Sequence, residues 1–365
     1  MSVVSGRFPE FPWDTIADAK AAAEAHPDGI VDLSIGTPVD PAPAIAREAL
    51  AGASDAHGYP TVLGPEPLRQ SAVDWLARRF GVVGLDSGQV LPVIGSKELI
   101  ANLPAQLGIG VGDVVVFPEL AYPTYEVGAR YVGAVPVAAD RPGDYGDTVP
   151  ALVYINSPAN PNGRILDRDE LREIVRWTRA HDVLLVSDEC YLDFAWEGTP
   201  YSVLHPDVCE GSFEGLLAVH STSKRSNLAG YRGSFVAGDR AVVAELLAVR
   251  KHLGFMMPAP VAAAMTAVLD DDLHVRTQRS LYAARRQALR GALEGAGFTI
   301  DDSEGALYLW ATRGEACRET VAWLAERGIL VAPGEFYGPA GSQHVRVAFT
   351  AADERIAAAV ARLRT

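Results

Sequence analysis

The sequence predicts an α/β protein in which a large domain is built on a mostly parallel sheet and a smaller domain is α+β. The first observation is that short apolar runs alternate with amphipathic helical patterns from Val90 to about Gly238, as in parallel sheets covered by helices on both faces. The second is that long helical patterns and further short strands follow Arg240. A chain of 365 residues is too long for one small core, which also favours two domains.

The elements are expected in a regular order along the chain. Apolar runs predict sheet strands at Val90–Ile94, Val114–Phe117, Ala151–Ile155, Val183–Val186 and Leu216–Val219. Helical patterns lie at about Asp14–Ala25, Glu66–Phe80, Asp169–Ala180, Arg240–Leu253, Ala259–Leu269 and Leu273–Leu293. The smaller domain adds strands Ala306–Ala311, Ile329–Ala332 and His344–Phe349 with helices Ala316–Arg327 and Asp353–Leu363. We place the large domain at 41–257 and the smaller one at 1–40 plus 258–365.

Composition argues against several kinds of protein. The formal net charge is −14, whereas a nucleic-acid-binding surface needs clustered cations. No apolar stretch reaches the roughly 18 residues of a membrane span, and no signal peptide is visible. The cysteines, Cys190, Cys209 and Cys317, are odd in number and widely spaced, which indicates neither a zinc site nor a disulfide framework. We therefore expect a cytoplasmic protein that binds no metal, membrane or nucleic acid.

The most informative stretch surrounds Lys224, which follows the apolar run Leu216–Val219. A lysine at the carboxyl end of a buried strand lies where open α/β sheets bind ligands. Ser221 and Ser223 precede it and Arg232 follows, and hydroxyls with a guanidinium suit a phosphate dianion. A lysine held near cations loses basicity, so its neutral amine can attack a carbonyl. This combination indicates pyridoxal phosphate (PLP) held as a Schiff base, although such a loop can also be a solvated connection.

Three further polar sites follow other strands of the same domain. Gly95-Ser96-Lys97-Glu98 opens a helix after a strand, where free backbone N–H groups suit a phosphate. Asn160 lies in an Asn-Pro-x-Gly turn directly after the run Ala151–Ile155. Asp188 ends a buried strand, which is costly unless a cation such as a protonated pyridine nitrogen pairs with it. Each has an ordinary structural reading as a helix start, a turn or a helix cap, and each gains weight from the others.

The Ser-x-Ser-Lys run, the stretch Gly230-Tyr231-Arg232-Gly233 and these motifs, in this order, resemble the class I/II aminotransferases, which are fold-type I PLP enzymes. The resemblance extends from Asp32 to Arg346. It implies a seven-stranded, mostly parallel sheet between helices, PLP as cofactor, and a homodimer with shared active sites. Two positions depart from the family pattern: the last glycine of the Gly-x-Arg-x-Gly stretch comes one place early, and Asn162 stands where threonine is usual.

The resemblance also implies roles for individual residues. Lys224 would bind PLP as a Schiff base and then move the substrate's α-proton as general acid/base, while Asp188 would keep the pyridine nitrogen protonated. Tyr191 would hydrogen-bond the 3′-oxygen and Tyr122 would stack on the ring. The other cofactor-binding residues would be Ser96, Lys97, Asn160, Ser221, Ser223, Arg232 and Tyr59, the last supplied by the neighbouring subunit. Without the resemblance, Tyr59 and Tyr122 read as packing residues.

For the substrate, the resemblance implies binding by Gly36, Asn160 and Arg346. A guanidinium fork is well shaped for the α-carboxylate, although an arginine between apolar neighbours, as at Arg346, is usually an exposed edge residue. Gly36 would let the backbone approach the carboxylate. The expected reaction is PLP-dependent transamination of small amino and 2-oxo acids.

The segments Phe11–Asp14, Val31–Pro41 and Ser226–Tyr231 look most like those of bacterial N-succinyldiaminopimelate aminotransferases. That implies transfer between N-succinyl-LL-2,6-diaminopimelate and 2-oxoglutarate or glutamate in lysine biosynthesis. No residue is identified for the succinyl group; Arg141, Arg250, Lys251 and His252 are available cations. Alternatives are an aminotransferase for aspartate, aromatic amino acids or N-acetylornithine, a PLP-dependent C–S lyase, and a non-catalytic nucleotide-binding α/β protein. The Phe/Pro/Trp arm near Phe11 packs on its own core or on a partner.

Overall fold

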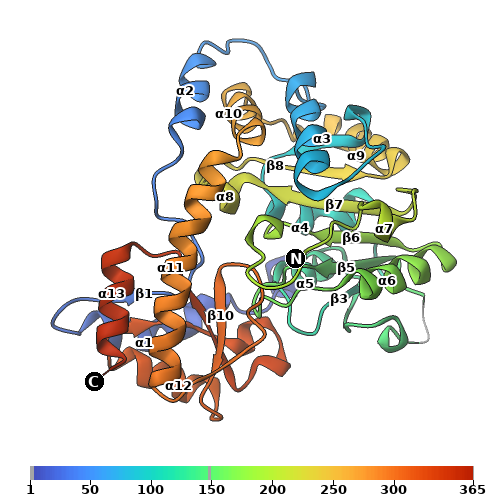
Figure 1. The fold of residues 1–365 in the computed structure, drawn as a ribbon. Coiled ribbons are helices and arrows are strands. Elements are labelled where there is room, and N and C mark those ends of the chain that lie inside the picture. Colours follow the sequence, from blue (N-terminus) through green and yellow to red (C-terminus); the bar gives the residue numbers. More distant parts are fainter. Residues whose placement is uncertain (1–3, 147–148, 365) are drawn as a thin grey trace.

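A seven-stranded sheet forms the centre of the computed structural model, which describes residues 4–146 and 149–364 (Figure 1). The strand order is β2-β8-β7-β6-β5-β3-β4. The strands are β2 (Val90–Val93), β3 (Val114–Phe117), β4 (Val135–Ala138), β5 (Leu152–Asn156), β6 (Leu184–Asp188), β7 (Leu216–Ser221) and β8 (Ser234–Gly238). Strands β4, β3, β5, β6 and β7 are parallel, and β8 is antiparallel to both of its neighbours. The predicted mostly parallel sheet is confirmed.

Helices cover both faces of this sheet because successive strand residues point to opposite sides. Val153 and Leu185 pack into one core, whereas Tyr154 and Val186 pack into another. The first core is covered by α3 (Glu66–Phe80), α6 (Arg168–Ala180), α7 (Pro206–Cys209) and α10 (Ala259–Asp270). The second is covered by α4 (Ser96–Gln106), α5 (Thr124–Val132) and α9 (Arg240–Leu253). Helix α6 begins at a capping box formed by Asp167.

A second, antiparallel sheet lies below the first in Figure 1, with strand order β12-β13-β10-β9. Its strands are β9 (Thr299–Asp301), β10 (Tyr308–Thr312), β12 (Ala332–Pro333) and β13 (His344–Ala348). Beside it, β1 (Val31–Asp32) pairs in parallel with β11 (Ile329–Leu330). The helices of this region are α1 (Ala17–Glu24), α12 (Cys317–Ala325) and α13 (Asp353–Arg362). The predicted single strand Ile329–Ala332 is therefore wrong, because the strand is interrupted at Val331 and the residues on either side pair in different sheets.

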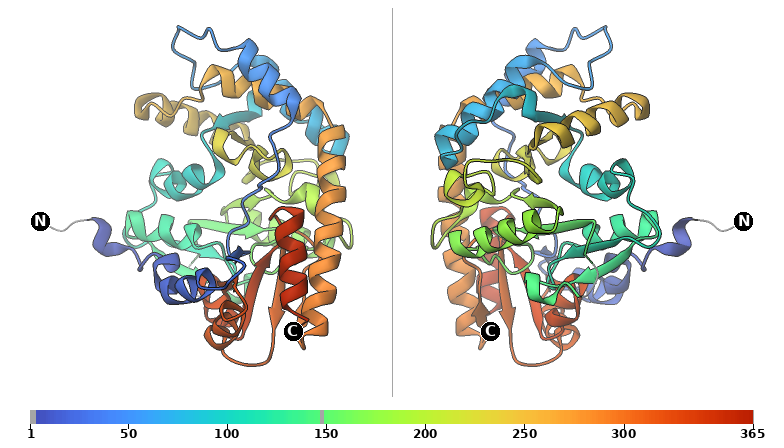
Figure 2. Two further views of the ribbon diagram at one scale, coloured as in Figure 1. Left: turned by 90° about the vertical axis from the view of Figure 1, so that its left-hand side faces the viewer. Right: turned by 90° about the vertical axis from the view of Figure 1, so that its right-hand side faces the viewer.

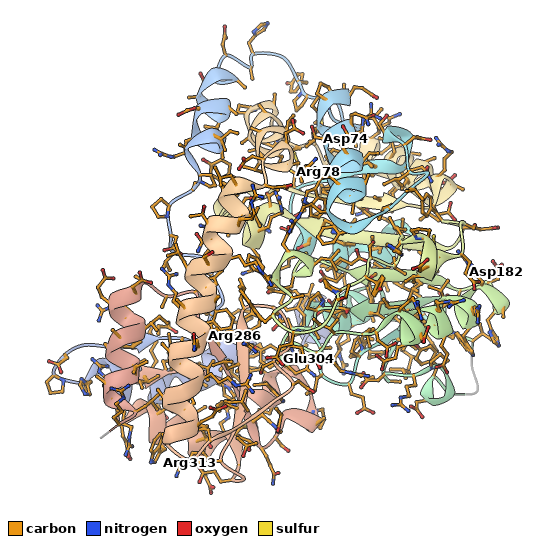
Figure 3. The ribbon with its side chains drawn as sticks, viewed as in Figure 1. Asp74, Arg78, Asp182, Arg286, Glu304 and Arg313 are labelled. Atoms are coloured by element: carbon orange, nitrogen blue, oxygen red, sulfur yellow. The ribbon has the colours of Figure 1, made fainter. Side chains whose placement is uncertain are left out.

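The 23-residue helix α11 (Leu273–Gly295) connects the two regions and runs beside α13, as both views of Figure 2 show. Near its start, Arg78 of α3 reaches Asp272 with a 3.0 Å ion pair. Further along, Arg286 donates a 2.9 Å hydrogen bond to the carbonyl of Ser303, next to Glu304 (Figure 3). Helix α11 and its first flanking residue thus contact both regions of the molecule.

Some elements were not predicted from the sequence. Helix α2 (Ala44–Gly52) packs on α10, and β4 is a partly exposed edge strand that contains Pro136. Strand β8 is fully buried, but Ser234 and Gly238 at its ends shorten its apolar run to Phe235–Ala237, so no strand-length apolar run marks it. Among the described helices, none is long and apolar enough to cross a membrane.

The N-terminal arm packs on its own chain. The ring of Phe8 lies 6.2 Å from that of Tyr131 in α5, and Trp13 lies 5.3 Å from Phe336 beside the antiparallel sheet. Arg318 donates a 2.9 Å hydrogen bond to the carbonyl of Thr15. The arm therefore bridges the two sheet regions within one subunit.

Candidate active site

A cavity of about 640 Å³ lies between the two sheets, at the carboxyl ends of β5, β6 and β7. All of the predicted site residues except Tyr59 line it: Gly36, Ser96, Lys97, Tyr122, Asn160, Asp188, Tyr191, Ser221, Ser223, Lys224, Arg232 and Arg346. Parallel strands meet this edge with the same polarity, so side chains far apart in sequence converge there.

Asp188 is a buried carboxylate at the end of β6, with 6% of its surface exposed. Oδ2 accepts a 2.9 Å hydrogen bond from the hydroxyl of Tyr125, and Oδ1 accepts one of 3.1 Å from the Cys190 N–H. Burial raises the pKa of Asp188, while these hydrogen bonds oppose the rise. None of the ion pairs in the described part of the chain includes Asp188. A buried carboxylate without a cation is costly, so the site fits a ligand with a protonated ring nitrogen.

Lys224 lies in α8 (Thr222–Arg225), a single helical turn after β7. The hydroxyl of Ser221 caps this turn by accepting a 3.1 Å hydrogen bond from the Ser223 N–H. The Nζ atom of Lys224 donates to the carbonyl of Gly36. Burial lowers the pKa of Lys224, and the positive charge of Arg346 lowers it further. A lysine with a lowered pKa supplies the neutral amine that carbonyl chemistry requires.

A chain of hydroxyl groups lies beside this turn. The Ser96 N–H donates a 3.0 Å hydrogen bond to Ser234 Oγ, Ser234 Oγ donates to Ser221 Oγ at 2.9 Å, and Ser221 Oγ donates to Ser223 Oγ at 2.9 Å. Sequence reasoning missed Ser234 because β8 was not predicted. The chain links the N-terminus of α4 to the lysine turn, a combination of donors that could hold a phosphate.

The guanidinium of Arg232 lies over the start of α4. A Cβ added at Gly95 would come within 2.2 Å of Arg232 Nη2, so only glycine lets the two approach so closely. Arg232 itself has a left-handed backbone with φ of 57°, which directs this arginine back across the loop. Its position adds a fixed positive charge to the candidate phosphate site.

Arg346 occupies the middle of β13, paired with both β10 and β12. It is 4% exposed, so the edge-residue reading is wrong. Nη1 donates a 2.7 Å hydrogen bond to Asn160 Oδ1 and Nη2 donates one of 2.7 Å to the carbonyl of Ser34. The guanidinium carbon lies 4.0 Å from the centre of the Tyr308 ring. This buried, oriented cation at the cavity wall could bind a carboxylate.

Tyr308 is a site residue that sequence reasoning missed. Its hydroxyl lies 2.7 Å from that of Tyr191, and a Cβ at Gly36 would come within 2.4 Å of its ring. Burial alone would raise the pKa of Tyr308, but the charges of Arg346 and Lys224 lower it. Its strand was predicted, yet nothing in the local sequence distinguishes this tyrosine from a core residue.

Several predicted or available groups lie elsewhere. Tyr59 is 96% exposed, in the segment between α2 and α3, and does not line this cavity. Arg250 is fully buried and bound to Glu98 at 2.9 Å. The described cations that do line the cavity, apart from Lys224, Arg232 and Arg346, are Lys20 and Lys97.

These side chains suit carbonyl chemistry on a phosphorylated ring that carries a basic nitrogen. A site of this kind, at the carboxyl edge of such a sheet, defines the class of the fold-type I PLP enzymes. Residues 28–363 match the family described as Aminotransferase class I and II, and the chain belongs to this family. It is therefore a PLP-dependent aminotransferase.

Individual relatives agree with the family. The chain is 63% identical over 360 residues to a probable aminotransferase, Rv1178, of Mycobacterium tuberculosis, covering 99% of this chain and 86% of the relative. It is 57% identical over 355 residues to the 4-dedimethylamino-4-oxo-anhydrotetracycline transaminase OxyQ of Streptomyces rimosus, covering 97% and 99%. The crystal structure of an aminotransferase from Neisseria meningitidis matches with a TM-score of 0.89 at 28% identity, covering 100% and 98%.

Proposed function

We propose that this aminotransferase transfers an amino group between N-succinyl-LL-2,6-diaminopimelate and 2-oxoglutarate, as a step of lysine biosynthesis. The observation that carries the proposal is that all three segments resembling the succinyldiaminopimelate enzymes line the cavity, through Phe11, Trp13, Asp14, Asp32, Ser34, Ile35, Gly36, Thr37 and Ala229. They line the same cavity as Lys224, so a long amino acid bound there would contact them.

Both proposed substrates carry a distal carboxylate in addition to the α-carboxylate. In the proposal, Arg346 holds the α-carboxylate, and Lys20 and Lys97 meet the distal charges. Lys97 would then serve the substrate and not the cofactor, the role that the resemblance implied for it. Lys20 lies on α1 and its only ion pair in the described structure is a 3.9 Å contact with Glu24. Both lysine side chains are exposed at the cavity wall, so neither is committed to a buried partner.

The site residues then divide the work. PLP, when bound, supplies a carbonyl that takes up the amino group and a ring that accepts electrons from the substrate's Cα. Asp188 holds the proton on the ring nitrogen, and Tyr122 and Tyr191 hold the ring in place. Arg346 and Asn160 orient the α-carboxylate so that the Cα–H bond faces Lys224. The Lys224 amine removes the proton from the substrate's Cα, and in the reverse half-reaction it returns a proton to that atom.

The proposal includes the assembly and domain organisation. Tyr59 is almost fully exposed on its own subunit, which supports a homodimer in which Tyr59 of the partner subunit reaches the cofactor phosphate. We retain residues 41–257 as the large domain and 1–40 with 258–365 as the small one. The spacing of the cysteines supports a reducing, cytoplasmic setting.

One second candidate has a specific observation behind it. The relative OxyQ is 57% identical and is named for a transaminase reaction on a tetracycline ketone. The exposed ring of Phe11 and the half-buried ring of Trp13 at the cavity wall would also suit a flat, apolar acceptor. Amination of a polycyclic ketone is therefore the alternative to an acidic substrate.

A donor and acceptor screen separates these functions. N-succinyldiaminopimelate should be among the best amino donors when compared with aspartate, aromatic amino acids and N-acetylornithine, and 2-oxoglutarate should be strongly preferred to pyruvate. If N-succinyldiaminopimelate is a poor donor, the proposed substrate is wrong. Borohydride reduction and peptide mapping test the lysine separately: the phosphopyridoxyl label should lie on Lys224 and disappear in Lys224→Ala. A label on another lysine would overturn the assigned site.

A further inference from the structure

One face of α11 carries a row of polar side chains. His274, Gln278, Tyr282 and Arg285 follow one another at spacings of four, four and three residues, so they lie on the same face of the helix. From first to last the row spans roughly 16 Å at the usual helical rise. Gln278, Tyr282 and Arg285 are 7%, 0% and 4% exposed. Buried polar groups require partners, and these partners come from separate segments of the chain.

The first end of the row holds the two residues that follow α8. Ser226 Oγ lies 2.9 Å from His274 Nε2. Asn227 Nδ2 donates a 2.8 Å hydrogen bond to Gln278 Oε1, and Asn227 Oδ1 accepts one of 3.3 Å from the Tyr282 hydroxyl. Asn227 has a left-handed backbone with φ of 54° and lies three residues after Lys224, just beyond the end of α8 at Arg225.

The other end of the row holds the segment that joins β1 to α2. Gln278 Nε2 donates a 2.7 Å hydrogen bond to Asp40 Oδ2. Arg285 binds both oxygens of Asp40, at 2.7 and 2.8 Å, and its Nε donates one of 2.6 Å to Asp353 of α13. Because Gln278 bonds Asn227 through its oxygen and Asp40 through its nitrogen, the lysine turn and this crossing segment share one amide.

The first end also has the outline of a hydrolytic triad, since His274 Nδ1 lies 2.5 Å from Asp271 Oδ2. Ser226 is only 1% exposed, however, and its Oγ also accepts a 3.2 Å hydrogen bond from Arg225 Nη1. A buried hydroxyl held in this way has no access to an acyl substrate. The arrangement instead fastens the residue after Arg225 to α11.

We propose that Asn227 is a positioning residue for Lys224, which it fastens through Gln278 to α11 and to the crossing segment at Asp40. This inference rests on the proposed role of Lys224. A single helical turn such as α8 is not stable by itself, so its orientation depends on what holds its ends. The approach of the lysine amine to the substrate's Cα therefore depends on how α11 is set between the two sheets.

The test compares Asn227→Gly with Ser280→Ala in the PLP-loaded enzyme. Glycine keeps the left-handed backbone available and removes only the side-chain hydrogen bonds. We expect kcat to fall roughly tenfold, as a displacement of order 1 Å can cause, with KM of the amino donor nearly unchanged and a larger kinetic isotope effect with α-deuterated donor. Ser280, whose hydroxyl donates to the carbonyl of Arg276 within α11, should tolerate alanine without change.

A second readout does not depend on turnover. When PLP is added to apo-enzyme, the absorbance of the lysine-bound cofactor should develop several-fold more slowly in Asn227→Gly than in the wild type or Ser280→Ala. Wild-type kinetics and isotope effect in Asn227→Gly would overturn the proposal. That result is distinct from a borohydride label on a different lysine, which would overturn the assigned role of Lys224 itself.

Gln278→Met provides the matched variant if Asn227→Gly does not fold. It removes the same link from the α11 side while keeping the length of the side chain. If the two residues act through one link, the double variant should be no slower than the worse single variant. Additive losses, or a loss in Gln278→Met that appears only in stability and leaves the isotope effect unchanged, would contradict the positioning role.

Discussion

The hydroxyl of Tyr125 donates a 2.9 Å hydrogen bond to Oδ2 of Asp188. Tyr125 is fully buried in α5, and its ring lies 5.0 Å from that of Tyr154 in β5. The tyrosine therefore fixes one carboxylate oxygen from α5, while the Cys190 N–H fixes the other. This arrangement orients Asp188 toward the cavity before any ligand binds.

Asp188→Asn should retain the cofactor but lose most of kcat, because an amide does not keep the ring nitrogen protonated. Asp188→Glu should be milder, since the charge remains. Proton abstraction is measured by single-turnover kinetics with an amino donor. Full activity in the asparagine variant would show that Asp188 serves only in packing or capping.

Tyr125→Phe should weaken PLP binding, because it removes a hydrogen bond to a charged group worth about 1.5–3 kcal/mol. The pKa of Asp188, which burial already raises, should rise further. The dissociation constant for PLP is measured by absorbance titration of the apo-enzyme. Unchanged affinity in the phenylalanine variant would mean that the hydroxyl does not support the carboxylate.

Arg346→Lys should lower kcat/KM in both half-reactions alike, since lysine keeps the charge but cannot donate to Asn160 and a carboxylate in a fork. Because Arg346 is buried, a loss of activity in this variant would come from a change inside the site and not from a change at the protein surface. Stopped-flow measurement of each half-reaction tests this prediction. A loss confined to one half-reaction would place Arg346 on the distal group of one substrate.

Tyr59→Phe should weaken PLP binding by about 1.5–3 kcal/mol, the range for one hydrogen bond to a charged group. Because Tyr59 does not line the cavity of its own chain, the effect requires a second subunit. Sedimentation gives the oligomeric state across a dilution series, and activity measured on the same samples should follow the fraction of dimer. A fully active monomer would exclude a shared site.

Glu189→Gln should stabilise the apo-enzyme at pH 8 but not at pH 5. Burial raises the pKa of Glu189 from 4.5 to about 7, so the folded state binds more protons between these values. Its stabilising contribution is therefore present below about pH 4.5 and is lost as the pH rises through 7.

The glutamine variant cannot lose a proton, so its free energy of unfolding should exceed the wild-type value by about 3 kcal/mol at pH 8. The Nε2 atom of His220 lies 3.4 Å from Glu189 Oε2. Burial lowers the pKa of His220 to about 3, so this histidine is neutral at both pH values and only Glu189 changes charge between them. Urea denaturation at the two pH values measures it. Parallel pH profiles would contradict a buried, protonated Glu189.

The sequence predicts most of this fold because the strands at the sheet centre are buried on both faces and contain continuous apolar runs, as at Leu152–Ile155 of β5 and Leu216–Val219 of β7. Strands β4 and β8 escaped the same reasoning. Strand β4 is partly exposed, and β8 is recognisable only through its pairing with β2 and β7. Register between strands is a property of pairs and is not written in either segment alone.

The sequence by itself determined the α/β class and the polar residues at the strand ends, including Lys224 and Asp188, because local motifs place a side chain at a strand's carboxyl end. Only the tertiary structure decided which other groups join them. Tyr308 meets Tyr191 across 117 residues, and Asn227 meets Gln278 across 51. Such contacts form where elements distant in the sequence pack against one another, and the residues of one segment do not specify which other segment it will contact.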